Sequence, residues 1–106
     1  MNLTLPQDFQ LEQEREGKLH LSFVLKPELP YFQGHFPESP ILPGVVQLGW
    51  AIHWAQELFK IASPVKKIEA LKFQMVLQPG DETRLELEHR PEKQDVLFAF
   101  HSHILA

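Results

Sequence analysis

A long apolar segment without proline, VVQLGWAIHWAQELFKIA, constrains most strongly what this chain can fold into. It follows Pro43-Gly44, and the preceding residues 27–43 are rich in proline. Proline excludes regular helix from residues 27–43, because its ring fixes φ and removes an N–H donor. The apolar segment itself predicts one helix of about four turns or more. Since this helix is apolar over most of its circumference, we expect other elements to wrap around it.

The remaining segments have the patterns of strands and turns. In residues 18–26, apolar and polar side chains alternate, and this period of two is typical of a half-buried strand. Further strands are expected at residues 9–15, 66–77, 82–90 and 95–105. One helix packed on one antiparallel sheet is the simplest way to bury so apolar a helix. We therefore predict a single α+β domain over residues 1–106.

Composition excludes several classes of function. The chain has 106 residues and no cysteine, which excludes a disulfide scaffold, a thiolate nucleophile and a Cys-ligated metal site. A net charge of −4 argues against nucleic acid as the main partner. The first ten residues lack the pattern of a signal peptide, and no stretch of about 18 apolar residues could span a bilayer. We expect a cytoplasmic protein with no membrane partner.

The loop before the helix, YFQGHFPESPILPGVV at residues 31–46, carries the residues suited to catalysis. His35 lies in this proline-stiffened loop, and an imidazole with an unperturbed pKa of about 6.5 suits acid–base chemistry. Gly44 and Val45 begin the helix, where N–H groups without intrahelical partners could polarise a thioester carbonyl. His35 could then remove the acidified α-proton. From these residues alone, a structural histidine and a simple helix start explain the pattern as well.

Two blocks of residues carry a family resemblance. The first is GHFP at residues 34–37 followed by PILPGV at 40–45, and the second is LKFQMVLQPGD at 71–81. In this order and spacing they resemble the FabA/FabZ-like 3-hydroxyacyl-[acyl-carrier-protein] dehydratases. The first block is specific, and the second is weaker because Pro-Gly-Asp is common turn chemistry. The resemblance covers about residues 19 to 106.

The resemblance implies a hot-dog fold, in which a bent antiparallel sheet wraps around one long helix. It implies a homodimer or higher homo-oligomer with active sites at the subunit interface. The reaction would convert 3-hydroxyacyl thioesters to trans-2-enoyl thioesters in fatty-acid or related lipid or polyene synthesis. The substrate would be carried on the phosphopantetheine of acyl carrier protein, and neither a metal nor another cofactor would be needed.

The same resemblance assigns roles to residues of this chain. His35 is the catalytic base, and Gly44 provides the amide that binds the thioester carbonyl, with Val45 beside it. Phe36 and position 49 belong to the substrate site.

The sequence departs from the family at position 49. The family pairs its histidine with a glutamate or aspartate on the central helix of the neighbouring subunit, and Gly49 stands there in this chain. Glycine inside a helix costs roughly 0.5–1 kcal/mol relative to alanine, so a reason for it is expected. Gly49 could permit close packing of another element. It could also make room for a bulkier acyl chain, with His53 one turn further on acting as the acid.

Three functions therefore stay open. The leading expectation is a dehydratase with His35 as base. The alternatives are a catalytically degenerate domain that binds acyl groups or carrier protein, and a hot-dog thioesterase that hydrolyses acyl thioesters.

Other charged residues were weighed for binding. A set of basic side chains could form a patch that receives an acidic carrier protein. Lysines scattered on strands also deter pairing between sheet edges, which is the other explanation for them. The set consists of Lys66, Lys67, Lys72 and Arg84. His101 and His103 alternate on the last predicted strand, but no third ligand is suggested, so we expect no metal site.

Overall fold

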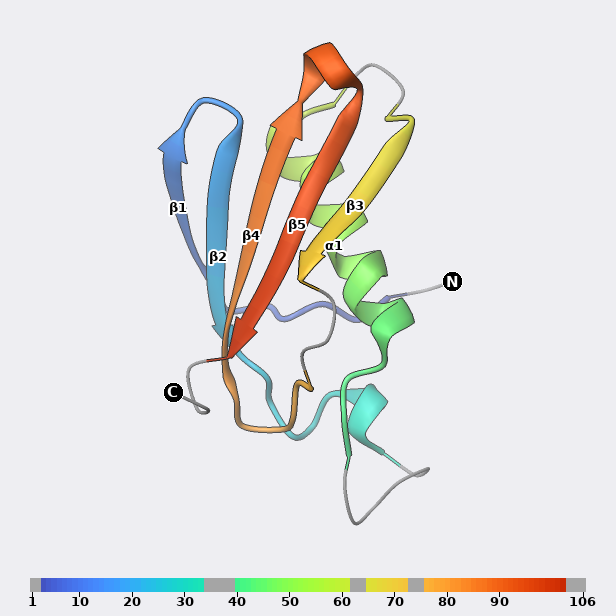
Figure 1. Cartoon of the computed structure of the whole chain (residues 1–106). Helices are drawn as coiled ribbons and strands as arrows, with labels where there is room; N and C mark the ends of the chain where they lie inside the picture. The colour runs from blue at the N-terminus through green and yellow to red at the C-terminus, as the bar shows by residue number, and fades with distance from the viewer. Residues whose placement is uncertain (1–2, 34–39, 62–64, 73–75, 103–106) are drawn as a thin grey trace.

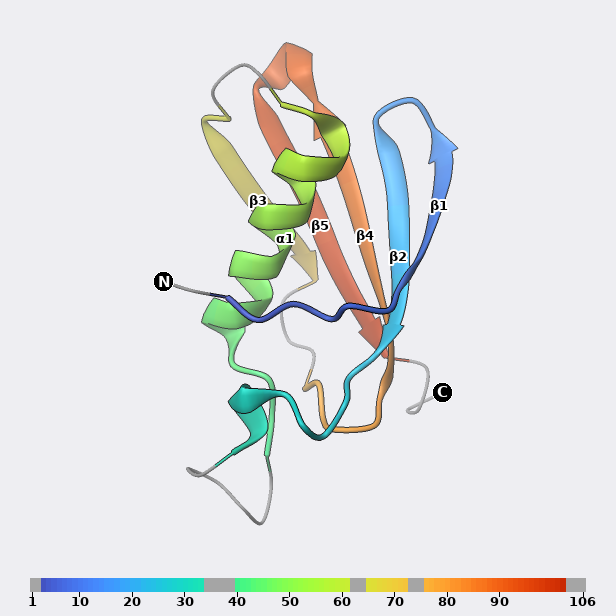
Figure 2. The same cartoon turned by 180° about the vertical axis from the view of Figure 1, so that it is seen from behind.

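The computed structural model describes residues 3–33, 40–61, 65–72 and 76–102. Within these residues it has one α-helix, α1 (Gly44–Phe59), and two short 3-10 turns, η1 (Pro30–Phe32) and η2 (Pro91–Lys93). The strands are β1 (Gln10–Arg15), β2 (Lys18–Val24), β3 (Lys67–Lys72), β4 (Glu82–Arg90) and β5 (Asp95–Ser102). They form one sheet in the order β1-β2-β4-β5-β3, and α1 lies against one of its faces (Figures 1 and 2).

The sheet is antiparallel except at one edge. β1, β2, β4 and β5 pair with antiparallel neighbours, whereas β3 runs parallel to β5. The parallel pair arises because the chain reverses once between β3 and β4 and again between β4 and β5. The predicted fold class, one helix against a largely antiparallel sheet, is confirmed.

The alternating patterns of the strands place one set of side chains against the helix. In β2, Leu19, Leu21 and Phe23 are buried, while His20 and Ser22 lie on the other face of the sheet. In β4 the buried residues are Thr83, Leu85 and Leu87. Every residue of β5 from Asp95 to Phe100 is buried, and the strand lies between β4 and β3 in the sheet.

The core of the molecule surrounds the inner side of α1. Trp50 is completely buried and its ring lies 6.0 Å from that of Phe23 and 5.9 Å from that of Trp54. The expectation that the helix is wrapped on several sides is met only in part within the described chain. Val45 is 60% exposed and Ile52 is 36% exposed. No helix of the described chain is long and apolar enough to cross a membrane.

The third strand is shorter than its sequence pattern predicts. We expected a strand over residues 66–77, but β3 spans Lys67–Lys72, and the described residues 76–78 are not in a strand. Leu77 instead accepts a hydrogen bond from the Leu42 amide at 2.8 Å. A strand that had to keep pairing with β5 could not also meet the loop before the helix. The first part of this apolar segment therefore pairs with β5, and its last part bonds the loop before the helix.

A paired charge closes the turn between β4 and β5 and gives a prediction about pH. Arg90 Nε and Nη2 donate to the two carboxylate oxygens of Asp95 at 2.8 and 2.6 Å. These hydrogen bonds hold the pKa of Asp95 below its ordinary value of 3.8. A carboxyl group whose pKa is lower in the folded than in the unfolded state stabilises the fold at pH values above its unfolded-state pKa. This stabilisation is lost as the pH falls through the folded-state pKa.

The melting temperature of Asp95→Asn should therefore lie furthest below that of the wild type near neutral pH. The difference should shrink as the pH falls below about 3.8. Thermal unfolding followed by circular dichroism over this pH range measures it. A difference that stays constant across the range would contradict the role of this pair.

Candidate active site

The start of α1 offers two unused hydrogen-bond donors. Pro43 is the N-cap with φ −59° and ψ 144°, and its carbonyl accepts from the amides of Val46 and Gln47 at 3.0 and 3.1 Å. The amides of Gly44 and Val45 form no hydrogen bond with another described residue. They point from the positive end of the helix dipole, which favours an oxygen that gains negative charge. This confirms the predicted helix start at Gly44.

A buried glutamine fixes the backbone that leads into this helix. Gln47 is only 5% exposed, and its Nε2 donates to the Leu42 carbonyl at 3.1 Å. The Leu42 amide in turn donates to Leu77, so both polar groups of residue 42 are bonded. Gln47 was not among the site residues predicted from the sequence. Its burial could have been inferred from its position in the sequence. Gln47 lies three residues before Trp50, which puts it on the apolar side of the helix.

The second block of the family resemblance has a structural role. Asp81 is 4% exposed, and its Oδ2 accepts from the Gln78 amide at 2.9 Å. Gly80, at φ 88°, donates to the Leu25 carbonyl, and Leu25 donates to the Asp81 carbonyl at 3.0 Å. The Pro-Gly-Asp turn is thus tied to the end of β2. Because neighbouring Leu77 bonds Leu42, the two blocks meet in space although they are far apart in the sequence.

The predicted catalytic loop is described only at its two ends. His35 and Phe36 lie outside the described residues, so their assignments stay predictions. Before this gap, the Tyr31 ring lies 6.0 Å from the Trp50 ring. After it, Leu42 is buried and is bonded to Gln47. Both ends of the loop therefore contact the N-terminal half of α1.

The remaining predicted site residues lie on the outward side of α1. Gly49 is half-buried, and a Cβ atom built on it would come within 2.9 Å of Leu3 Cδ1. His53 is exposed one turn further on, and it forms no hydrogen bond or ion pair with any described residue. The structure therefore supports the close-packing explanation of Gly49. It brings no partner to His53.

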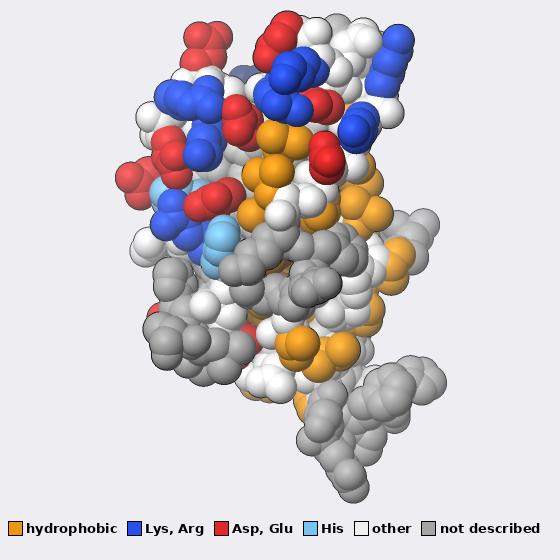
Figure 3. Space-filling view, in the orientation of Figure 1, with side chains coloured by type: hydrophobic (Ala, Val, Ile, Leu, Met, Phe, Trp, Pro, Cys, Tyr) orange, Lys and Arg blue, Asp and Glu red, His pale blue; other side chains and the backbone are white. Residues whose placement is uncertain are grey.

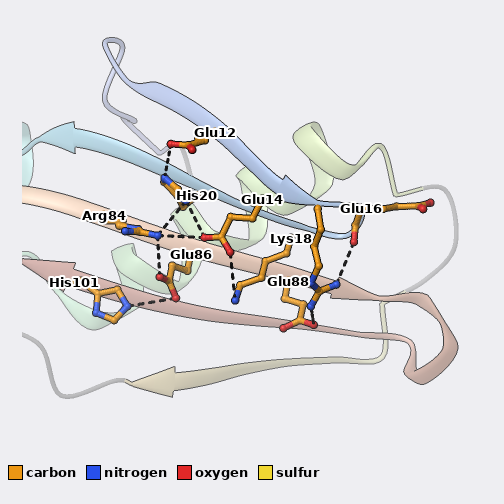
Figure 4. A network of polar contacts seen from close by, with 10 residues as sticks. Glu12, Glu14, Glu16, Lys18, His20, Arg84, Glu86, Glu88 and His101 are labelled. Carbon is orange, nitrogen blue, oxygen red and sulfur yellow. Dashed lines mark hydrogen bonds and ion pairs between the residues drawn. The ribbon is translucent and has the colours of Figure 1, made fainter.

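A charged cluster occupies the face of the sheet opposite α1 (Figure 4). Arg84 Nη2 lies 3.2 Å from Glu14 Oε1 and 3.4 Å from Glu86 Oε1. The His20 imidazole contacts Glu14 at 3.1 Å, and this hydrogen bond is the main reason that the pKa of Glu14 is lowered. Arg84 is therefore engaged by carboxylates on this face, and its predicted grouping with Lys66, Lys67 and Lys72 stays a prediction. Within the described chain, no group of side chains is suited to hold a metal ion.

A mixed five-stranded sheet against one long helix, with open amides at the helix start, defines the hot-dog class. The family profile described as ApeI-like, ApeI dehydratase, matches residues 11–105. The chain belongs to the ApeI-like dehydratase family, and the resemblance found in its sequence is confirmed.

Solved structures and curated sequences agree with this family. The dehydratase heterocomplex ApeI:P from Xenorhabdus doucetiae is 34% identical with a TM-score of 0.81, and the match covers 93% of this chain and 88% of that one. An uncharacterized protein from Erwinia carotovora subsp. atroseptica is 28% identical with a TM-score of 0.74, over 93% and 83% of the two chains.

Among curated sequences, the 3-hydroxyacyl-[acyl-carrier-protein] dehydratase FabZ of Caldicellulosiruptor saccharolyticus is 38% identical over 66 residues. The FabZ of Clostridium perfringens is 39% identical over 66 residues. These matches cover 56% of this chain and 47% and 48% of the two relatives. The chain thus spans about half the length of the curated relatives it matches.

Proposed function

We propose that this protein removes water from 3-hydroxyacyl thioesters and forms trans-2-enoyl thioesters, as a 3-hydroxyacyl-[acyl-carrier-protein] dehydratase. The observation that carries the proposal is the opening of α1. There the amides of Gly44 and Val45 are free of other described partners, within a segment that matches a dehydratase family.

The proposed chemistry begins at these amides. The thioester carbonyl oxygen accepts from the Gly44 N–H, and the helix dipole stabilises the negative charge that develops on it. His35 removes the acidified α-proton, and the bond between C3 and the hydroxyl oxygen then breaks. The leaving hydroxyl needs a proton to depart as water, and the His35 imidazolium carries one after the first step. A group from another subunit and His53 are the alternative acids.

The acyl group is proposed to arrive on the phosphopantetheine of an acyl carrier protein. The support is that the FabZ relatives are 3-hydroxyacyl-[acyl-carrier-protein] dehydratases. Lys66 and Lys67 are exposed at the start of β3 and are the described lysines that could meet an acidic carrier. The absence of a metal or other cofactor, and the cytoplasmic location, stay predictions.

A second hot-dog subunit is proposed to pack beside β3. This strand lies at the edge of the sheet, and its Leu71 is 62% exposed. Val45 and Val76 are 60% and 50% exposed. Figure 3 shows hydrophobic side chains at the surface on this side of the molecule, below the charged side chains that crowd its upper end. Covering such side chains stabilises a small domain.

The second subunit could be another copy of this chain, as the sequence predicts, or a related one. The solved relative ApeI:P is a heterocomplex. Gly49 is compatible with both arrangements, because the carboxylate that this chain lacks could come from a different subunit or be replaced by another acid.

Hydration of enoyl thioesters, the reverse reaction, tests the proposal. We expect the purified protein to hydrate crotonyl or longer enoyl thioesters, measured by loss of the enoyl-thioester absorbance, and to sediment as at least two copies. No turnover across a range of chain lengths would reject catalysis by this chain alone. Binding of acylated carrier without turnover would then indicate the degenerate domain. Release of free thiol, detected with a thiol-reactive dye, would indicate a thioesterase.

A further inference from the structure

The first described residues of the chain cross the outer side of α1 in its N-terminal half (Figure 2). We call residues 3–9 the strap. Thr4 holds it at both of its backbone polar groups. The Thr4 carbonyl accepts from the Trp50 indole Nε1 at 3.1 Å, and the Thr4 amide donates to the Tyr31 hydroxyl at 2.7 Å. The strap is therefore bonded to a core residue of the helix and to the loop that leads toward His35.

The other end of the strap is held by two contacts. The Phe9 ring meets the Trp54 ring edge-on at 5.8 Å, and Asp8 pairs with Lys26 at 2.9 Å. Between these points the strap does not pack tightly on the segment after β2. A cavity of about 210 Å³ separates them, lined in part by Leu5, Pro6 and Leu29. A few specific contacts thus keep the strap on the helix.

Leu3 gives the strap a direct relation to the substrate site. A Cβ atom at position 49 would lie 2.9 Å from Leu3 Cδ1 and 3.2 Å from Leu3 Cδ2, closer than side chains normally approach. Glycine is unfavourable inside a helix, and this close approach supplies the reason for it. A side chain at position 49 therefore requires the end of the Leu3 side chain to move.

Position 49 is also close to the carbonyl-binding amides. It lies four residues after Val45, which is one turn along the same side of the helix and about 6 Å along its axis. The acyl carbons of a thioester held at the start of α1 would reach position 49.

We propose that the strap takes the place of a side chain at position 49, so that Leu3 forms an apolar wall of the thioester site where a catalytic carboxylate would otherwise stand. The term thioester site rests on the proposed function, whereas the contact between the strap and the helix does not. Under this proposal, a carboxylate introduced at position 49 competes with the strap. Gly49→Glu alone therefore does not create a working acid.

A double-mutant cycle on thermal stability tests the contact. In the Leu3→Ala background, Gly49→Ala should raise the melting temperature by about 4–8 °C, because alanine favours helix over glycine by about 1 kcal/mol. In the wild-type background the same change should give less than half of that rise, because the new methyl group meets Leu3. Protein concentration is kept equal throughout. Equal shifts in the two backgrounds would overturn the proposal.

The Trp50 indole N–H reports the strap directly, without any need for turnover. In Gly49→Glu, its protection from hydrogen exchange should fall by about tenfold or more, because the bond to Thr4 is lost. The backbone amides that pair β2 with β4, away from the strap, serve as an internal reference. Gln56→Glu, a matched change at an exposed position two turns further along the same helix, should leave Trp50 protected. Unchanged protection in Gly49→Glu would overturn the proposal.

The hydration assay separates this inference from the proposed function. A wild type without turnover rejects catalysis by this chain alone, while the melting-temperature cycle and the Trp50 exchange measurement still test the strap. If the wild type is active, Gly49→Glu should not exceed its rate. A higher rate with Trp50 still protected would show that a carboxylate fits beside Leu3, and the strap proposal would fail while the function stands.

Discussion

Replacing His35 with alanine is expected to lower the rate of enoyl-thioester hydration by about 10²–10⁴-fold, the contribution typical of general acid–base catalysis. Elimination of water needs a base for the α-proton, and an imidazole near its unperturbed pKa is suited to this at neutral pH. The loop that carries His35 is held to the N-terminal half of α1 through Tyr31 before the undescribed stretch and through Leu42 after it.

Two further histidine variants make this prediction specific. His89→Ala is the matched control, because His89 stacks at 5.5 Å on Phe59, the last residue of α1. A helix of 16 residues places that end about 24 Å from Gly44. We expect the hydration rate of His89→Ala to equal that of the wild type. A comparable loss in His53→Ala would assign the acid to His53, and an unimpaired His35→Ala would contradict the mechanism.

Replacing Trp50 with alanine is expected to lower the free energy of unfolding by about 3–5 kcal/mol, the range for truncating a large buried aromatic residue. Trp50 has no exposed surface, and its ring contacts those of Phe23, Tyr31 and Trp54. Its indole also holds the strap through Thr4. The substitution leaves a cavity beneath the strap and removes the anchor of the catalytic loop in one step.

Urea unfolding of the two proteins at equal concentration measures this loss. Gln56→Ala, an exposed change on the same helix, is the control and should alter stability by no more than about 0.5 kcal/mol. A loss below about 1 kcal/mol in Trp50→Ala would mean that Trp50 is not the centre of the core.

Much of the fold could be predicted because its signals are local. Alternation of side chains located β2 and β4, and proline followed by glycine located the start of α1 at Gly44. The family resemblance rested on short runs of residues in a fixed order, and the comparisons confirm it over residues 11–105. The ends of the elements were less certain. β3 stops earlier than its pattern suggests, because Leu77 bonds Leu42 instead of continuing the sheet.

The candidate site was predictable only in outline. Gly44 and Val45 lie as expected, but Gln47 and Asp81 were not foreseen as the groups that hold the surrounding backbone. The partners of Arg84 were not foreseen either, since it contacts Glu14 and Glu86 on the face of the sheet away from α1. Each difference depends on which distant residue supplies a partner, and periodicity contains no information about that.

The sequence by itself determined the helix, the alternating strands, the dehydratase motif and the missing carboxylate at position 49, because each depends on residues close together in the chain. Only the tertiary structure decided that β3 runs parallel to β5, that the two motif blocks are joined through Leu42 and Leu77, and that Leu3 fills the space beside Gly49. These are contacts between segments far apart in the sequence. They exist only once the sheet has closed on the helix and brought those segments within bonding or van der Waals distance.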